Sequence, residues 1–269
     1  MDLRGASADS LSVASGKLRR LVTSGADAAA IADDLFMVAT TVREEPTLRR
    51  VLTDVSIAAE AKQGLVREIL AGKAGQDATG LVAEAVALRW TVGRDLPGAL
   101  ELLGEIAAVL SAGNDGDRLS DELFAVKQLV DENPELRDAL SDPVRSAADK
   151  STLLDSLLAG KVLPATIGLA NQALSGSYRT VSAALSAYQA VAAKVRDEAV
   201  ATVRVAKPLT DADLARLGQG LTRQYGRTIH LNVIVDPAVI GGIKVELGDD
   251  VIDGTVASRL DDARRRLAG

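Results

Sequence analysis

"DELFAVKQLVDENPELRDALSDPVRSAADKSTLLDSLLAGK", residues 121–161, repeats an earlier stretch of the chain, "DDLFMVATTVREEPTLRRVLTDVSIAAEAKQGLVREILAGK", residues 33–73. The two stretches align without a gap, and about 18 of the 41 positions are identical, far more than composition alone would give. Past this block the copies align again after a shift of about three residues, which pairs residues 93–107 with residues 178–192. The chain therefore contains a duplicated unit, which either adds bulk and length or provides two surfaces for partners.

Each copy is predicted to be a helical bundle. Apolar residues recur at helical spacing, Pro46 and Pro134 stand where a new helix begins, and short connections favour antiparallel neighbours. The first copy has an additional helix at roughly residues 7–22, and the second copy has no separate segment for it. The second bundle therefore either lacks this helix or borrows one from the first. With a linker at residues 111–118, we expect bundles over residues 1–112 and 113–195.

The tail, residues 196–269, follows a different pattern. Apolar residues alternate at period two from Ala199, a helix start is marked by Thr210, and further alternating segments lie at residues 227–237 and 239–247. A last helix is predicted from about Thr255. The predicted fold is thus mostly α plus α/β, with two related N-terminal helical bundles followed by a small C-terminal β-α-β-β-α domain.

The glycine- and aspartate-rich stretch at residues 241–255 could cradle a phosphate, hold a divalent cation or fold the chain tightly. It lacks the GxxxxGK[ST] and GxGxxG spacings, and its acids do not alternate as in a calcium loop. We therefore interpret it as structural: a turn, a bulge or close backbone approach, a hairpin turn and a helix start. The residues of this motif are Asp236, Pro237, Gly241, Gly242, Gly248, Asp249, Asp253, Gly254 and Thr255.

Composition excludes several classes of function. A net charge of −6 and 2% aromatic residues argue against a nucleic-acid partner. The chain has no cysteine, which excludes disulfides and thiolate zinc sites, and its one histidine, His230, is assigned to a surface or edge strand. We expect no catalytic, metal or cofactor-binding residue. Four residues remain as candidate partner contacts, although helix packing is the favoured role of the last two: Leu11, Leu18, Trp90 and Tyr178.

The N-terminus carries charges where a signal peptide needs an apolar core, and no apolar run approaches the roughly 20 residues of a membrane span. We therefore expect any membrane association to depend on another chain.

The second bundle and the tail resemble the delta subunit of F-type ATP synthases, the family of the mitochondrial oligomycin-sensitivity-conferring protein. The specific part is the tail, with "VDPAVIGGIKVELGDDVIDGT", residues 235–255, where Thr255 replaces a frequent serine. The resemblance covers residues 120–269 well and the first bundle more weakly. Because ordinary members carry one bundle, this chain is similar to the enlarged actinobacterial form.

The resemblance implies a non-catalytic protein without cofactors. It implies that the helical part binds N-terminal segments of the alpha subunits and that the tail joins the b subunit, so that the head is held against rotor torque. Such a protein lies at the cytoplasmic face of the bacterial plasma membrane, as a peripheral part of the complex. Two alternatives stay open: a free helical-repeat adaptor for unrelated amphipathic helices, and an enzyme with a nucleotide or metal at residues 241–255.

Overall fold

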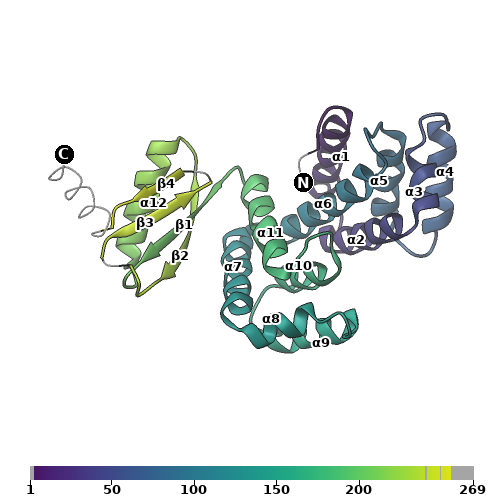
Figure 1. Cartoon of the computed structure of the whole chain (residues 1–269). Helices are drawn as coiled ribbons and strands as arrows, with labels where there is room; N and C mark the ends of the chain where they lie inside the picture. The colour runs from purple at the N-terminus through teal and green to yellow at the C-terminus, as the bar shows by residue number, and fades with distance from the viewer. Residues whose placement is uncertain (1–2, 240, 249, 256–269) are drawn as a thin grey trace, which may run out of the picture. The chain divides into compact units, whose positions relative to one another are not determined.

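The computed structural model describes residues 3–239, 241–248 and 250–255 (Figure 1). The chain divides into two compact units, Met1–Val191 and Ala192–Gly269, and the boundary falls inside one helix. The first unit holds both copies of the repeat, and the second is the tail. The finer division of the first unit at residue 112 stays a prediction.

The first copy contains six helices among the described residues, in agreement with the predicted bundle. They are α1 (Ala6–Thr23), α2 (Ala28–Glu44), α3 (Pro46–Thr53), α4 (Ala59–Leu70), α5 (Gln76–Ala87) and α6 (Asp95–Ser111). The second copy follows after a single short 3-10 turn, η1 (Gly113–Asp115), so the predicted linker is largely helical. Its helices are α7 (Gly116–Glu132), α8 (Pro134–Ser141), α9 (Ala147–Leu158), α10 (Pro164–Ser175) and α11 (Val181–Val195).

Four helices of one copy match four helices of the other residue by residue. The bounds of α2, α3, α4 and α5 become those of α7, α8, α9 and α10 when 88 is added, for example 28 + 88 = 116. The turns match too: Pro46 and Pro134 each open a helix after a residue with φ of −107° and −115°. The shift between the copies therefore falls after α5, in a loop of residues 88–94 that shortens to residues 176–180.

Repeated aspartates explain why the next turn is also shared. The Oδ1 atom of Asp54 accepts a hydrogen bond from the backbone N–H of Ser56 at 2.8 Å, and Asp142 does the same for Val144 at 2.8 Å. Such side-chain acceptors stabilise a turn directly after a helix. The short α3 and α8 therefore end in the same way because the sequence repeats the residue that ends them.

In the second copy, α6 of the first copy takes the place of the missing helix. In the first copy α1 packs against α5 and α6, and Ser7 of α1 accepts a hydrogen bond from the N–H of Thr91 in the α5–α6 loop at 2.8 Å. In the second copy α6 packs against α10, and Glu101 of α6 accepts one from the N–H of Ser177 in the α10–α11 loop at 2.9 Å. Helix α6 thus lies against the second copy as α1 lies against the first.

The C-terminal unit is a four-stranded sheet in the order β2-β1-β3-β4 among the described residues. Its elements are β1 (Ala199–Val205), α12 (Asp211–Tyr225), β2 (Ile229–Val235), β3 (Ile243–Leu247) and β4 (Asp250–Asp253). Strands β1 and β2 are parallel and joined by α12, whereas β3 is antiparallel to β1. Alternate residues of β1 and Leu221 of α12 form the buried core of the unit.

Helix α12 begins and ends where the sequence predicts. The hydroxyl of Thr210 accepts from the N–H of Asp213 at 3.2 Å, and Gly226 closes the helix with φ of 71°.

The prediction for the tail was incomplete in one respect and wrong in another. The hairpin about Gly248 returns as a further strand, β4, which the predicted element order omits. The strand predicted from Val239 begins only at Ile243, because Gly241 and Gly242 adopt φ of 65° and 80°, outside the strand region. Asp249 and the predicted last helix after Thr255 lie outside the described residues.

Candidate functional site

The contacts of the predicted tail motif are with the chain's own backbone. Asp236 accepts from the N–H of Ala238 at 2.9 Å, and Asp253 accepts from the N–H of Thr255 at 2.9 Å. A hydrogen bond from the side chain of Thr255, together with this backbone one, lowers the pKa of Asp253. Gly242 lies so close to the backbone of Gly254 that a Cβ atom at this position would overlap it. These contacts support a turn-forming role, which stays a prediction for the motif as a whole.

The four candidate partner contacts fall into two groups. Leu18 is fully buried, and Trp90 is buried with its indole N–H donating to the carbonyl of Ala85 at 2.9 Å. These two side chains therefore pack in the core of the first copy, while Leu11 and Tyr178 are half-buried. A role in partner contact stays a prediction for all four.

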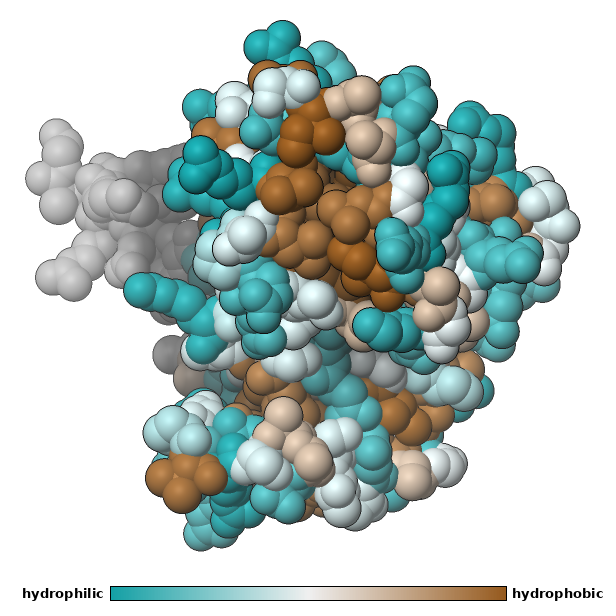
Figure 2. Space-filling model, turned by 90° about the vertical axis from the view of Figure 1, so that its right-hand side faces the viewer, coloured by the Kyte–Doolittle hydropathy of each residue, from teal (hydrophilic) through white to brown (hydrophobic). Residues whose placement is uncertain are grey.

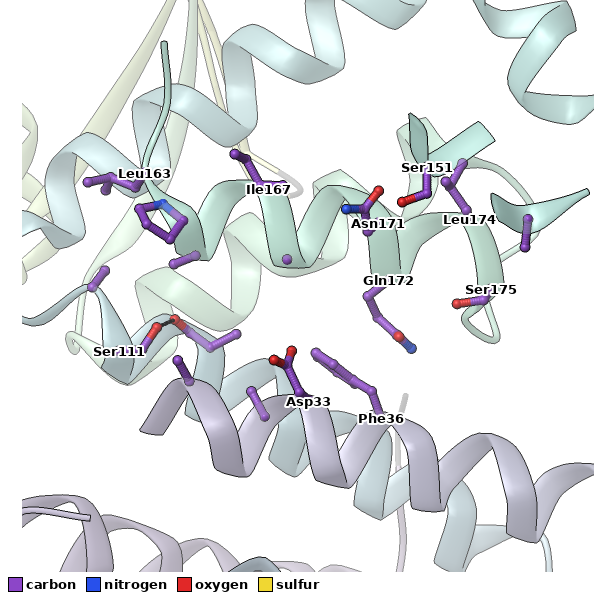
Figure 3. A pocket seen from close by; sticks show the side chains of 18 of the residues that line it. Asp33, Phe36, Ser111, Ser151, Leu163, Ile167, Asn171, Gln172, Leu174 and Ser175 are labelled. Atoms are coloured by element: carbon purple, nitrogen blue, oxygen red, sulfur yellow. Dashed lines mark hydrogen bonds between the residues drawn. The ribbon is translucent and has the colours of Figure 1, made fainter. Parts of the chain in front are cut away.

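A groove of about 910 Å³ lies between the two copies (Figure 3). Helices α2 and α6 form one side of it, and α9 and α10 form the other. More than half of its lining residues are small: Ala29, Ala32, Ala108, Ser111, Ala112, Ala147, Ala148, Ser151, Ala165, Gly168 and Ser175. Walls of this kind let the backbone of a bound helix come close, as in helix-in-groove recognition.

The polar residues of this groove are acidic or neutral. Asp33 and Asp115 line it, and no lysine or arginine of the described chain is among its lining residues. In Figure 3 Asp33 extends from α2 and Gln172 from α10. The pKa of Asp33 is raised by burial and by the neighbouring charges of Asp34 and Asp27. A cationic group on a bound segment would offset this unfavourable charge.

A buried polar cluster joins the copies beside this groove, and it is not among the site residues predicted from the sequence. Glu101 of α6 is buried and pairs with Arg43 of α2, with Oε2 to Nη2 at 2.5 Å. Its other oxygen, Oε1, accepts from Gln172 at 3.2 Å and from the backbone of Ser177 at 2.9 Å. One carboxylate thus binds one helix of the first copy and two segments of the second.

Glu105 lies one turn further along α6 and is also buried. It accepts a hydrogen bond from the hydroxyl of Tyr178 at 3.1 Å, and the ring of Tyr178 meets Tyr188 edge to face at 5.7 Å. Burial and the charge of Glu101 raise the pKa of Glu105 to about 8. Burial likewise raises the pKa values of both tyrosines. A carboxyl with such a pKa is typical of acid–base sites, but Glu105 lines none of the hollows described here, so we assign it to packing between the copies.

The sequence does carry a signal for this cluster. Helix α6 is apolar on nearly every side and buried along most of its length, yet it contains two glutamates four residues apart. Charged residues are rarely buried without a partner. Two acids in an otherwise apolar helix therefore predict a buried polar contact, although they do not say where its partners lie.

Apolar residues also gather on the side of the helical unit that carries α3, α4 and α5, in the hollow seen in Figure 2. The cavity there measures about 20 Å³ and is lined by Val38, Thr41, Val42, Leu48, Leu52, Val66, Ile69, Leu70 and Val82. Apart from Thr41 its lining residues are apolar, so we assign this hollow to the packing of α2, α3, α4 and α5.

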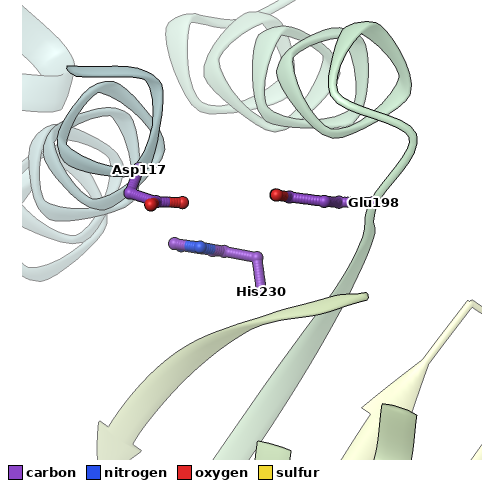
Figure 4. Close-up of side chains that lie close together, drawn as sticks. All are labelled: Asp117, Glu198 and His230. Atoms are coloured by element: carbon purple, nitrogen blue, oxygen red, sulfur yellow. The ribbon is translucent and has the colours of Figure 1, made fainter. Parts of the chain in front are cut away.

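In the C-terminal unit, Glu198 precedes β1 and His230 lies on β2, which is an edge of the described sheet (Figure 4). Glu198 pairs with Arg196, Oε1 to Nη2 at 3.0 Å. Asp117, also drawn in Figure 4, belongs to the helical unit, and we assign no metal site to these residues.

Within the described residues no single helix is long and apolar enough to cross a membrane. The pair Asp95–Ser111 and Gly113–Glu132 meets the requirement by length and composition alone, but it is bent by 103°.

The comparison with known families decides the assignment. The family model described as ATP synthase delta (OSCP) subunit matches residues 106–267, more than half of the chain. The chain belongs to the ATP synthase delta (OSCP) subunit family. This confirms the resemblance seen in the sequence, and it places the chain among F-type ATPase components associated with ATP synthesis and ion transport.

Several relatives match nearly the whole length of the chain. A protein named ATP synthase subunit delta from a Nocardioides species is 58% identical over 99% of this chain and 98% of its own length. Proteins of the same name from Kineococcus radiotolerans and Streptomyces avermitilis are 44% and 41% identical, over 93% and 100% of this chain and 92% and 100% of their own lengths. The similarity therefore includes the first copy of the repeat, which the family model does not reach, as expected for the enlarged actinobacterial form.

Proposed function

We propose that this chain is a peripheral-stalk subunit of an F-type ATP synthase and takes no part in catalysis itself. It links the catalytic head, through N-terminal segments of the alpha subunits, to the membrane-anchored b subunit and so resists the torque of the rotor. The observation that carries this proposal is similarity over the full chain to proteins named ATP synthase subunit delta. Its place is the cytoplasmic face of the bacterial plasma membrane, where it is held by its partners.

The groove between the copies is the part of the helical unit that fits an alpha segment best. It is formed by α6 and α10 with α2 and α9 beside them, and its small residues leave room for an amphipathic helix anchored at i, i+3, i+4 and i+7. Asp33 and Asp115 favour a lysine or arginine on that helix. We therefore assign the alpha segment to this groove.

The C-terminal unit has apolar residues in position for the b subunit. Val235 at the end of β2 and Val251 and Ile252 of β4 are exposed, at 47%, 57% and 37% of their surface. Exposed apolar residues on edge strands are a common feature of partner-binding surfaces. This supports the tail as the contact for b.

The first experiment tests the complex as a whole. The full chain with an affinity tag is expressed in its own cells, and membranes are solubilised in mild detergent before capture. We expect alpha and b subunits in the captured material. Recovery of neither would refute the proposed function, and recovery of unrelated helical proteins instead would favour the free adaptor.

The second experiment tests the groove. A Cβ atom at Gly168 meets nothing within 4 Å, so Gly168→Leu places a large side chain in the groove without a clash at its base. We expect this variant to weaken binding of an alpha N-terminal peptide to the full chain about tenfold or more in calorimetry, a loss of about 1.4 kcal/mol.

The duplication supplies a matched control for this variant. Gly80 is the equivalent residue of the first copy (80 + 88 = 168), and a Cβ atom there also meets nothing within 4 Å. Gly80→Leu is expected to leave peptide affinity unchanged. The opposite result, with loss only in Gly80→Leu, would move the alpha site to the first copy and overturn the assignment of the groove.

A further inference from the structure

Three arginines line one hollow on the first copy. Helix α3 and the loop before α6 surround an open hollow of about 540 Å³, lined by Pro46, Arg49, Arg50, Thr53, Val92, Gly93 and Arg94. No aspartate or glutamate of the described chain is among these residues. The chain as a whole is acidic, with 37 acidic and 31 basic residues. A hollow whose charged lining residues are all arginines therefore has the opposite charge to the chain as a whole.

The arginines differ in what holds them. Arg49 donates to the carbonyls of Arg43 at 2.7 Å and Val42 at 3.3 Å, in the last turns of α2, where a cation is favourable. Arg50 and Arg94 are exposed, and neither forms an ion pair with a described carboxylate within 4.0 Å. Two guanidinium groups are therefore available to a ligand beside a third that is fixed, and Arg50 also acts on Asp54, whose pKa is lowered by hydrogen bonds from Ser56 and further by the charge of this arginine.

A glycine brings the two sides of the hollow together. A Cβ atom at Gly93 would lie 3.1 Å from the hydroxyl oxygen of Thr53, tighter than ordinary contact. Glycine thus lets the loop approach α3 closely and places Arg94 next to the arginines of the helix.

The second copy shows that the fold does not need this charge. Arg137 matches Arg49 and also donates to a carbonyl at the end of the preceding helix, that of Asp131 at 3.4 Å. Asp138 stands in the place of Arg50, although α8 has the same bounds as α3 after the offset. Since the same packing forms with an aspartate at this position, Arg50 is not required for folding.

We propose that this hollow binds an acidic peptide segment of a partner protein, with guanidinium–carboxylate pairs at Arg50 and Arg94. The hollow is open, so a small anion bound in it would stay hydrated and would be screened by salt. A segment with several carboxylates forms its second pair at a high effective concentration, which strengthens binding without any further contact. Planar guanidinium groups also suit carboxylates geometrically. This site is independent of the groove assigned above.

The test is an NMR titration of the full ¹⁵N-labelled chain. The probe is a twelve-residue peptide with alternating glutamate and alanine, and the control peptide has glutamine in place of glutamate. We expect the acidic peptide to shift the backbone signal of Gly93 and the Nε signals of Arg50 and Arg94. The glutamine peptide should leave these signals unchanged.

Variants then locate the binding. Arg50→Asp, which copies the second repeat, and Arg94→Gln should each weaken binding about two- to fivefold, and the double variant about tenfold or more. Arg179 matches Arg94 in the alignment of the copies, so Arg179→Gln is the control and should change nothing. Folding of each variant is verified from its unfolding transition.

Three outcomes would overturn the proposal. They are an acidic peptide that shifts none of these signals, affinity that is unchanged in the double variant, and displacement of the peptide by an equal concentration of inorganic pyrophosphate. The last outcome would identify a site for small anions instead.

Discussion

Replacing Arg43 by methionine should destabilise the helical unit more than any exposed ion pair in it can account for. The change keeps a long side chain but leaves the carboxylate of Glu101 without its cation. The side chain of Glu101 is 3% exposed and that of Arg43 is 29% exposed. The carboxylate is therefore buried, whereas the guanidinium group is partly exposed to solvent. Removing one partner of a buried pair costs about 3–5 kcal/mol. Because Arg43 is partly exposed, we expect about 3 kcal/mol.

The assay uses the single tryptophan. Trp90 is buried in the helical unit and is the only tryptophan of the chain, so its fluorescence follows unfolding of that unit in denaturant. For a unit of this size, a loss of about 3 kcal/mol corresponds to a fall of roughly 6–12 °C in the melting temperature. The denaturant midpoint should fall while the slope of the transition stays constant.

A double-mutant cycle separates the interaction energy of the ion pair from the other effects of each substitution on stability. Glu101→Gln removes the buried charge, so the combination Arg43→Met with Glu101→Gln should recover much of the loss. Arg118 and Glu122 are the control, because their pair is an exposed i,i+4 contact on the arginine side, worth about 0.3–0.5 kcal/mol. A coupling energy for Arg43 and Glu101 no larger than the control would refute the argument that Arg43 compensates the buried charge of Glu101.

Three further predictions follow from the same structure. Because the pKa of Glu105 rises to about 8 on folding, the folded state binds more protons than the unfolded state above about pH 4.5. Stability should therefore fall between pH 4.5 and 8 by at most roughly 1.4 kcal/mol per pH unit, and Glu105→Gln should flatten this slope in denaturant titrations at several pH values. Gly176→Ala should destabilise the helical unit by about 1–3 kcal/mol, because the new Cβ atom would lie 2.6 Å from the buried Oε1 atom of Glu101. Gly64→Ala should stabilise it slightly, because a Cβ atom at this position of α4 meets open space. Gly242→Ala should unfold the sheet, because φ is +80° and the new Cβ atom would overlap the backbone of Gly254. Gly226→Ala, at φ of +71° with open space around it, should cost only about 1 kcal/mol. Circular dichroism of the full chain distinguishes the two outcomes.

The helices of both copies could be predicted because the residues that start and end them are themselves repeated. Pro46 and Pro134 open the short helices, and Asp54 and Asp142 close them with the same side-chain hydrogen bond. Local chemistry of this kind needs no knowledge of the rest of the fold. The bounds of α7, α8, α9 and α10 therefore follow from those of α2, α3, α4 and α5 by a constant offset.

The buried cluster could not be predicted in the same way. Glu101 binds Arg43, which is 58 residues earlier, and Gln172, which is 71 residues later. No spacing rule connects residues so far apart, and only the presence of acids in an apolar helix marks the position. Strand β4 was missed for another reason. All four of its residues are exposed, so it lacks the alternation of buried and exposed residues by which a strand is recognised.

The position of α6 explains how the second copy can fold without a helix of its own that corresponds to α1. A bundle copied without its first helix would expose the apolar face that this helix covers, unless another helix takes the place. Helix α6 does so because it is apolar on nearly all sides, and therefore packs against α2 with one face and against α10 with another. The two glutamates of α6 form hydrogen bonds to Arg43 in the first copy and to Ser177 and Tyr178 in the second, so this helix is joined to both copies by polar contacts as well. The groove that we assign to the alpha segment is lined by the C-terminal end of the same helix, at Ala108 and Ser111, so α6 contributes both to the contact between the copies and to the proposed binding site.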